Sequence, residues 1–232
     1  MALEVALARL ARLLRGPDRV GRAPVLVMLA GSNGAGKSTF HAAYLAELGL
    51  PFVNADLIAA ELRSGARAIP PHLAALPVDH AAQRLADEER DASVVLGRSF
   101  ITETVLSDPI GAKIALLRDA RSRGYHVWLF FVGIGSPALS RARVRERVAA
   151  RGGHDVPDDR IDERYPRTLA NLPGAVAAAS EAVLLDNDSV AEPYRFVAHF
   201  REGTLVKRSR RSPKWATPAL AARHPPRERR PR

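Results

Sequence analysis

The stretch VLVMLAGSNGAGKSTF, residues 25–40, decides the fold of this chain. Its centre matches the complete P-loop (Walker A) pattern G-x-x-x-x-G-K-[ST]. In this pattern the glycines let backbone N–H groups approach phosphate oxygens, Lys37 brings positive charge to the β- and γ-phosphates, and the Ser38 hydroxyl ligates Mg²⁺. We therefore expect a site for ATP and Mg²⁺. The residues expected to hold the nucleotide are Gly31, Ser32, Asn33, Gly34, Ala35, Gly36, Lys37, Ser38 and Thr39.

Apolar runs and helical patterns alternate along the chain. The runs that predict strands are 25–30, 50–56, 99–104, 125–134 and 181–187. The patterns that predict helices are 39–48, 57–63, 79–96, 108–123, 136–151 and 157–171. This alternation predicts an α/β fold with a mainly parallel sheet flanked by helices on both faces, the P-loop NTPase (kinase-like) fold.

Composition excludes several kinds of function. The 232 residues suit one α/β domain with appendages, and the absence of cysteine excludes disulfides, thiolate zinc sites and cysteine nucleophiles. The seven histidines show no metal-binding spacing, so the only metal expected is the Mg²⁺ bound with ATP. No apolar run reaches the ~18 residues of a membrane span. We expect a cytoplasmic enzyme that makes no contact with membranes.

The chain divides into three parts. Residues 1–20 predict a helix whose leucines at 3, 7, 10 and 14 lie on one face and pack on the core, and Glu4, Arg9 and Arg12 argue against a signal peptide. Residues 21–200 form the predicted kinase domain, with a lid at 141–172. The role of the loop 63–77 cannot be read from its sequence.

The third part, residues 201–232, is expected to be a basic, Pro-rich and largely disordered tail. Residues 207–232 carry ten Lys and Arg against one acid, Glu228, which accounts for +9 of the net charge of +10. Such a composition buries too little apolar surface to fold, although Trp215 is a candidate anchor for a short piece. The tail is a candidate for weak binding of polyanions.

Two acids follow predicted strands, at the sheet edge where ligands of such folds bind. Asp56 is either the general base that receives a proton from an acceptor hydroxyl or an ordinary N-cap of the next helix, and position alone does not choose between these roles. Glu103 and Thr104 are either contacts to the acceptor or a polar strand end that faces water.

Arginines are concentrated in the predicted lid. Arg143, Arg147 and Arg151 share one helical face, and a second predicted helix carries further arginines at 160, 164 and 167. One interpretation is a lid that closes arginines over the transferring phosphoryl group. The other is a solvated face on which the arginines pair with Glu146, Asp162 and Glu163.

These motifs together resemble a known family. GSNGAGKST, VNADLIA, ITETVLS, GYHVWLFFV and RVRERVAARGGHDVPDDRIDERYPRTLANL occur in the order and spacing of zeta-toxin-like P-loop kinases, in the branch often labelled as predicted ABC-type ATPases. The resemblance covers roughly residues 24–190. It implies transfer of phosphate from ATP to a sugar hydroxyl of UDP-N-acetylglucosamine, and an antitoxin protein as partner.

The resemblance also implies roles for single residues. Asp56 would be the general base, and Glu103 and Thr104 would touch the acceptor. The residues that would act on the phosphates are Lys37, Arg147 and Arg164. Arg143 and Arg151 are the next candidates for the role of lid arginine.

Some features depart from the family or from its label. The region after the second strand, where an acceptor would be recognised, differs from the better-known toxins, so the kinase assignment is firmer than the acceptor. The chain has no LSGGQ-type signature, its AVLLDND run follows the lid, out of the usual Walker B order, and no N-K-x-D motif specifies guanine. The alternative function is a nucleotide-dependent switch ATPase whose basic tail binds nucleic acid.

Overall fold

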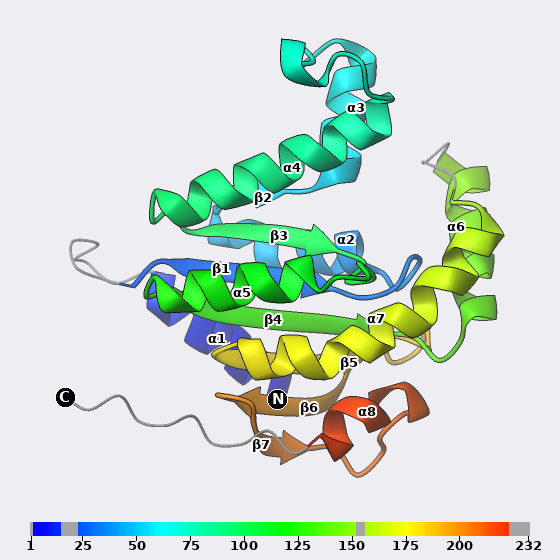
Figure 1. Cartoon of the computed structure of the whole chain (residues 1–232). Helices are drawn as coiled ribbons and strands as arrows, with labels where there is room; N and C mark the ends of the chain where they lie inside the picture. The colour runs from blue at the N-terminus through cyan, green and yellow to red at the C-terminus, as the bar shows by residue number, and fades with distance from the viewer. Residues whose placement is uncertain (1, 15–22, 152–155, 223–232) are drawn as a thin grey trace.

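One seven-stranded sheet forms the centre of the molecule (Figure 1), with strand order β2-β3-β1-β4-β5-β6-β7. The computed structural model of the protein describes residues 2–14, 23–151 and 156–222. The strands are β1 Val25–Ala30, β2 Phe52–Val53, β3 Phe100–Thr104, β4 His126–Gly133, β5 Glu181–Asp186, β6 Arg195–Arg201 and β7 Thr204–Arg208. The first five are parallel, whereas β6 and β7 continue the sheet in antiparallel pairing. The predicted mainly parallel α/β fold is confirmed.

Helices cover both faces of this sheet. They are α1 Ala2–Leu14, α2 Lys37–Phe40, α3 Ala55–Ser64, α4 Val78–Val95, α5 Ala112–Ser122, α6 Pro137–Arg151, α7 Asp158–Ala178 and α8 Thr217–Ala221. After α2 the helical path continues as a π-helical turn, His41–Leu45, and a 3₁₀ turn, Ala46–Leu48. In Figure 1, α5 and α7 lie in front of the sheet, α1 and α2 lie behind it, and α6 extends beyond the carboxyl ends of the strands.

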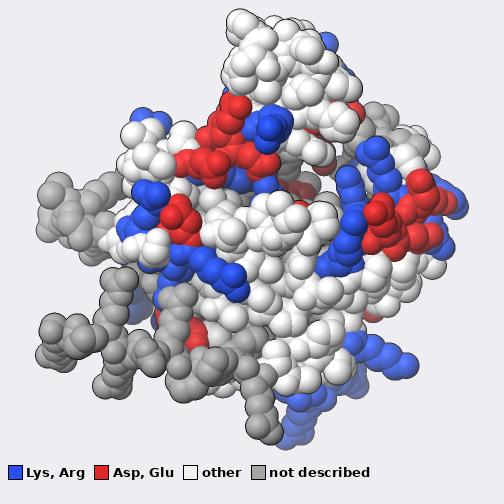
Figure 2. All heavy atoms as spheres, viewed as in Figure 1, with Lys and Arg blue, Asp and Glu red and all other residues white. Residues whose placement is uncertain are grey.

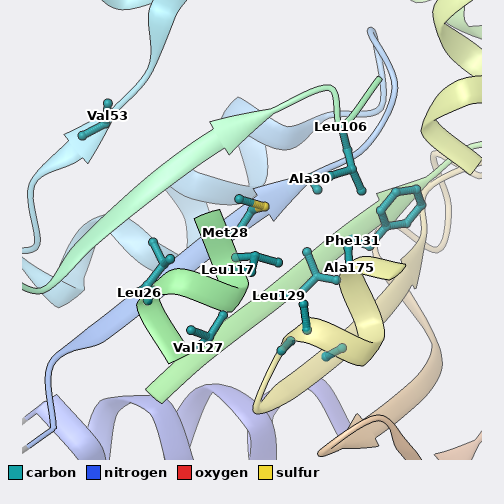
Figure 3. Packing of buried hydrophobic residues seen from close by; sticks show 14 of the residues in the cluster. Leu26, Met28, Ala30, Val53, Leu106, Leu117, Val127, Leu129, Phe131 and Ala175 are labelled. Atoms are coloured by element: carbon teal, nitrogen blue, oxygen red, sulfur yellow. The ribbon is translucent and has the colours of Figure 1, made fainter. Parts of the chain in front are cut away.

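The core has two layers because neighbouring residues of a strand face opposite sides. On β1, Leu26, Met28 and Ala30 pack with α5 and α7, and Figure 3 shows them beside Leu117 and Ala175. The intervening residues of β1 pack with α1 and the helical path after the P-loop. All six β1 residues are buried, as expected for a parallel strand covered on both faces.

The N-terminal helix packs as predicted. Leu10 is fully buried, and Leu3, Leu7 and Leu14 lie partly buried against the same apolar layer. The rest of the predicted 1–20 segment lies outside the described residues. Helix α7 extends to Ala178, beyond the predicted end at 171, because it continues through Pro173.

The predicted disorder of residues 201–232 is wrong for the described part, residues 201–222. Strand β7 pairs with β6, and a 3₁₀ turn at Lys214–Ala216 leads into α8. Trp215 is only 3% exposed, and Ala216 and Ala219 are fully buried. Main-chain pairing and burial of this small apolar set therefore order a segment whose charge suggested disorder. Residues 223–232 lie outside the described residues, and polyanion binding stays a prediction.

Candidate functional site

Three glycines of the P-loop are fixed by backbone shape and close packing. Gly31, Gly34 and Gly36 have φ angles of +147°, +67° and +91°. A β-carbon on Gly31 would lie 2.1 Å from the carbonyl oxygen of Val132, and one on Gly34 would lie 2.8 Å from that of Ser140. Glycine is therefore required at these positions to shape the loop, before any contact with phosphate is considered.

Two residues after β5 hold the same loop. The Asn187 side chain donates a hydrogen bond to the Ala35 carbonyl at 2.8 Å, and the Tyr194 hydroxyl donates to the Gly36 carbonyl at 2.9 Å. Burial raises the pKa of Tyr194. Both residues were missed in the sequence, because they lie about 150 positions from the loop and belong to no phosphate-binding motif. The fold alone brings them to it.

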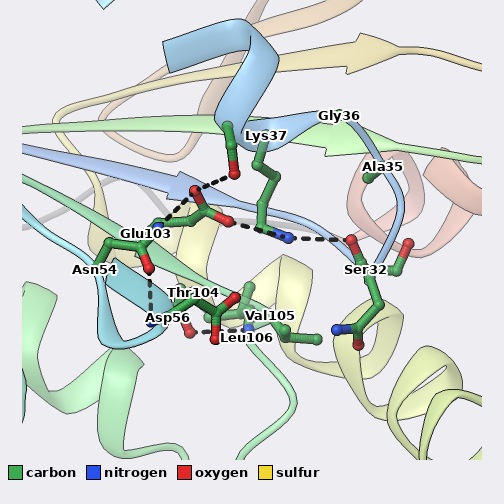
Figure 4. A network of polar contacts seen from close by, with 12 residues as sticks. Ser32, Ala35, Gly36, Lys37, Asn54, Asp56, Glu103, Thr104, Val105 and Leu106 are labelled. Atoms are coloured by element: carbon green, nitrogen blue, oxygen red, sulfur yellow. Dashed lines mark hydrogen bonds and ion pairs between the residues drawn. The ribbon is translucent and has the colours of Figure 1, made fainter. Parts of the chain in front are cut away.

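Lys37 and Ser38 meet the carboxylate that ends β3 (Figure 4). Lys37 Nζ lies 3.1 Å from the Ser32 carbonyl oxygen and 3.6 Å from Glu103 Oε1, and the Ser38 hydroxyl donates to Glu103 Oε2 at 3.2 Å. Lys37 is only 7% exposed. Glu103 thus contacts the side chains of two P-loop residues, Lys37 and Ser38. Its place in the sequence did not predict these contacts.

Asn54 connects Glu103 to the start of α3. Its side-chain nitrogen donates to Glu103 Oε2 at 3.0 Å, and its side-chain oxygen accepts from the backbone N–H groups of Asp56 and Leu57. Asn54 is therefore the N-cap of α3, and the interpretation of Asp56 as that cap is wrong. Asp56 lies in the first turn of the helix. The Asn at the end of the 50–54 run was the available signal for the cap.

A buried arginine supports the end of β3 from α4. Arg90 is 4% exposed, donates to the Thr102 hydroxyl at 2.6 Å and contacts the Glu103 carbonyl at 3.3 Å. Burial lowers the pKa of Arg90, and Asp87 raises it in opposition. Arg90 belongs to no recognisable motif, so its role could not be predicted from the sequence.

Thr104 has a local structural contact. Its hydroxyl accepts a hydrogen bond from the backbone N–H of Leu106, whose φ of +62° marks a sharp turn after β3. Helix α7 secures this turn, because the Thr168 hydroxyl donates to the Val105 carbonyl and Asn171 donates to the Leu106 carbonyl. Contact of Thr104 with an acceptor stays a prediction.

One pocket joins these elements. It has a volume of about 350 Å³ and lies at the carboxyl ends of the strands. Figure 2 shows a hollow between the α3–α4 part of the molecule and the arginine-rich α6–α7 part. The lining residues are Asn33, Gly34, Gly36, Lys37, Ser38, Thr39, Asp56, Glu103, Val105, Arg143, Glu146, Arg147 and Ala150. The pocket therefore contains residues of the P-loop, both predicted carboxylates and two of the predicted lid arginines, Arg143 and Arg147.

The arginines of helix α6 lie on two different faces of the helix. Arg141 pairs with Asp162 and Arg145 with Asp158, which are exposed contacts between α6 and α7. The other face turns to the pocket and carries Arg147 and Arg143. The expected solvated pairing thus exists, but it mainly uses residues other than the predicted lid arginines.

The predicted lid arginines differ in their surroundings. Arg143 donates to the backbone carbonyls of Asn187 and Asp188 at 2.6 and 3.1 Å, so it is part of the wall. Arg164 on α7 is half-buried: burial, Arg160 and Arg167 lower its pKa, and the charge of Asp56 raises it. Arg164 and Asp56 therefore interact electrostatically. The side chain of Arg151 and the Gly-Gly-His segment after it lie outside the described residues.

The sheet order, the P-loop and the pocket define the fold of a P-loop kinase. A family model described as Zeta toxin matches residues 11–201. The chain belongs to the Zeta toxin family.

Solved structures agree on the fold. A structure of the PezAT chromosomal toxin–antitoxin system of Streptococcus pneumoniae is 19% identical, with a TM-score of 0.54 over 84% of this chain and 80% of that one. The AvrRxo1-ORF1:-ORF2 complex with ATP is also 19% identical, with a TM-score of 0.54 over 88% of this chain and 67% of that one. A search of curated proteins found no match. No helix in the described part of the chain has the length and apolarity that a membrane crossing needs.

Proposed function

We propose that the protein is an ATP-dependent kinase that transfers the γ-phosphate to a hydroxyl of a small acceptor. One observation carries the proposal: the P-loop, Asp56, Glu103 and Arg147 all line a single pocket. A switch ATPase needs a phosphate loop but no general base beside a space for an acceptor. The basic segment that suggested nucleic acid is, over residues 204–222, folded onto the sheet.

The P-loop wall is suited to ATP and Mg²⁺. The Ser38 hydroxyl and the Glu103 carboxylate are 3.2 Å apart and provide oxygen donors, which Mg²⁺ prefers. We propose that these two residues hold the ion, which neutralises phosphate charge when bound. Glu103 would then serve the metal rather than the acceptor. ATP in the AvrRxo1 complex supports nucleotide binding by this fold.

Asp56 is proposed as the general base. Its carboxylate accepts the proton of the acceptor hydroxyl while that oxygen bonds to the γ-phosphorus and the bond to the bridging oxygen of ADP breaks. Asp56 is not needed to cap its helix, because Asn54 does so. Arg147 lines the pocket, and Arg164 interacts with Asp56, so both are placed to stabilise the charge that moves during transfer.

The acceptor and partner are proposed from the family. UDP-N-acetylglucosamine is the first acceptor to test, although the α3–α4 region that would recognise it departs from the better-known toxins. An antitoxin is the proposed partner, since the PezAT structure comes from a toxin–antitoxin system. A cytoplasmic location stays a prediction.

Phosphotransfer with labelled ATP tests the proposal. The wild-type protein is incubated with γ-labelled ATP and Mg²⁺, with UDP-N-acetylglucosamine in one arm and a small-molecule cell extract in the other. Mass spectrometry then searches for a product heavier by one phosphoryl group. Lys37→Ala is the inactive control, and Arg145→Ala, on the opposite face of α6 from the pocket, is the matched active control. ATP binding without a phosphorylated product in either arm would favour the switch ATPase.

A further inference from the structure

The C-terminal segment, residues 204–222, pairs with β6 through β7 and inserts one buried tryptophan, Trp215, against the sheet. Trp215 packs so closely on Gly133 of β4 that a β-carbon there would lie 2.3 Å from its ring. Its ring centroid lies 5.4 Å from that of Phe131. Its Nε1 donates a hydrogen bond to Asp186 Oδ1 at 3.0 Å. The carboxylate that ends β5 is therefore the polar partner of this tryptophan in the sheet.

Asp186 has a second partner, Arg195 at the start of β6. The Arg195 guanidinium pairs with Asp186 Oδ2 at 2.6 Å and also donates to the carbonyl of Arg211. Both oxygens of this 6%-exposed carboxylate are thus occupied by protein groups. Asp186 is the first acid of the AVLLDND run, and these contacts give it a structural role rather than that of a metal ligand.

The residue after Asp186 reaches the phosphate-binding loop. Asn187 donates from its side chain to the Ala35 carbonyl, and its side-chain oxygen accepts from the backbone N–H of Tyr194 at 3.3 Å. Tyr194 in turn donates to the Gly36 carbonyl and has a φ of +54°, an unusual angle for a residue with a side chain. A continuous set of contacts thus runs from Trp215 through Asp186 and Asn187 to the P-loop.

We propose that the C-terminal segment is a clamp that positions the phosphate-binding loop, with Trp215 as its positioning residue. The matched part of the family model ends at residue 201, before this segment. The proposal rests on ATP binding as proposed above. Its physical basis is preorganisation. If the loop were disordered in a fraction of the molecules, those molecules could not bind ATP and the apparent affinity would fall, so a contact that orders the loop raises the affinity.

The test compares Trp215→Phe with a matched control. Phenylalanine keeps an aromatic ring on Gly133 but removes the N–H that Asp186 accepts. Tyr125→Phe is the control, because it removes a hydroxyl that donates to the Ser93 and Arg98 carbonyls at the amino-terminal end of β4, away from the pocket. Both variants lose buried hydrogen bonds and both should melt at lower temperature.

Only Trp215→Phe should affect the P-loop. We expect faster hydrogen exchange at the amides of residues 31–38, and an ATP Kd raised about three- to tenfold, the range that one net hydrogen bond allows. The kcat at saturating ATP should change less than KM. In an Asn187→Ala background the substitution should add little, because both residues act through one path.

The outcomes separate this proposal from the proposed function. If the wild-type protein fails to bind ATP, the proposed function fails, whereas hydrogen exchange at residues 31–38 still tests the clamp. If Trp215→Phe and Tyr125→Phe lower the melting temperature equally and leave P-loop exchange and the ATP Kd at wild-type values, Trp215 only stabilises the fold and the clamp is wrong.

Discussion

The two walls of the pocket are built in different ways. The phosphate wall, which is the P-loop at residues 31–38, is held by main-chain contacts. Gly31 lies against Val132 and Gly34 against Ser140, at distances that admit no side chain on either glycine. The lid wall, formed by α6 from Val144 onward and the start of α7, has a small apolar cluster of its own. That cluster comprises Val144, Val156 and Ile161, with Val148 packed against it. Exposed ion pairs join its two helices.

Because of this difference, the two walls should contribute differently to nucleotide binding and to phosphoryl transfer. A shift of the phosphate wall breaks buried contacts, whereas exposed ion pairs contribute only about 0–1 kcal/mol each. Displacing the lid wall should therefore cost less than moving the P-loop, which Ser140 at the start of α6 helps to hold. We expect substitutions in the phosphate wall to affect binding and transfer together, and substitutions in the lid wall to affect mainly transfer.

Lys37→Ala should have the largest effect. It removes the one ammonium in the phosphate wall, and we expect transfer to fall by roughly 10³-fold or more, together with ATP affinity. The fold should survive, since Asn54 and Ser38 still donate to the Glu103 carboxylate. Titration calorimetry with ATP and circular dichroism check the two statements. Near-normal turnover in this variant would remove the basis for the kinase assignment.

Asp56→Asn should separate catalysis from structure. Asparagine keeps the size of the side chain but cannot take the proton, so phosphotransfer should fall by roughly 10² to 10⁴-fold. The melting temperature and the ATP Kd should stay close to wild type, because Asn54 caps the helix. All three quantities can be measured on one preparation. Transfer within a few-fold of wild type would mean that another group is the base, with Glu103 the next candidate.

Arg147→Ala and Arg164→Ala test the lid wall directly. Each should lower kcat by roughly 10²-fold, the scale for one charge donor at the transition state, with a smaller effect on ATP affinity. Steady-state kinetics with ATP varied at saturating acceptor measure both. An increase in KM for ATP with unchanged kcat, in both variants, would show that the arginines bind nucleotide and form no catalytic lid.

A buried acid far from the pocket should affect stability without affecting either wall. Glu181, at the opposite end of β5 from the pocket, is 1% exposed. Burial alone would raise its pKa, but its hydrogen bond with His199 and the charges of Arg9 and Arg201 hold the pKa below the usual 4.5. The folded state therefore gains stability from ionised Glu181 above pH 4.5 and loses it as the pH falls through the lowered value.

Urea unfolding between pH 7 and pH 3 measures this loss. Glu181→Gln should cost about 2 kcal/mol at pH 7, the scale of hydrogen bonds to a charged group, and should flatten the curve below pH 4.5. Burial lowers the pKa of His126, so protonation of this side chain destabilises the folded state as the pH falls below about 6.5. This loss of stability is also expected in the variant. An unchanged slope below pH 4.5 would contradict the assignment to Glu181.

Arg145→Ala should have the smallest effect. Its side chain is 68% exposed and pairs with Asp158 outside the pocket, so we expect a stability change within about 0.5 kcal/mol and normal transfer. Thermal melting and the phosphotransfer assay check this. A loss of transfer similar to that of Arg147→Ala would show that the two faces of α6 do not act separately.

The sequence predicted what depends on local pattern. Strands β1, β4 and β5 are continuous apolar runs, and the P-loop is a contiguous motif, so each could be identified from neighbouring residues. Strands β6 and β7 were missed because they mix apolar and charged residues near the sheet edge, and all five residues of β7 are exposed.

The sequence could not show contacts between distant segments. Asn187 and Tyr194 reach the P-loop, and Trp215 reaches Asp186, only because the strand order places β5 beside β4 and β4 beside β1. Glu103 could be selected as a strand-end acid, but its contact with Lys37 and Ser38 depends on β3 lying beside β1. Such juxtapositions follow from topology, which no local pattern encodes.

The contacts of the phosphate loop also affect when the protein can first act. The loop at 31–38 leaves the ribosome early, yet its supports come from Val132, Ser140, Asn187 and Tyr194. At about 5–20 residues per second, roughly 8–30 s separate synthesis of the loop from synthesis of its last support. The growing chain therefore carries a complete P-loop sequence without the walls that shape it. We therefore expect nucleotide binding to strengthen only after most of the polypeptide has been translated.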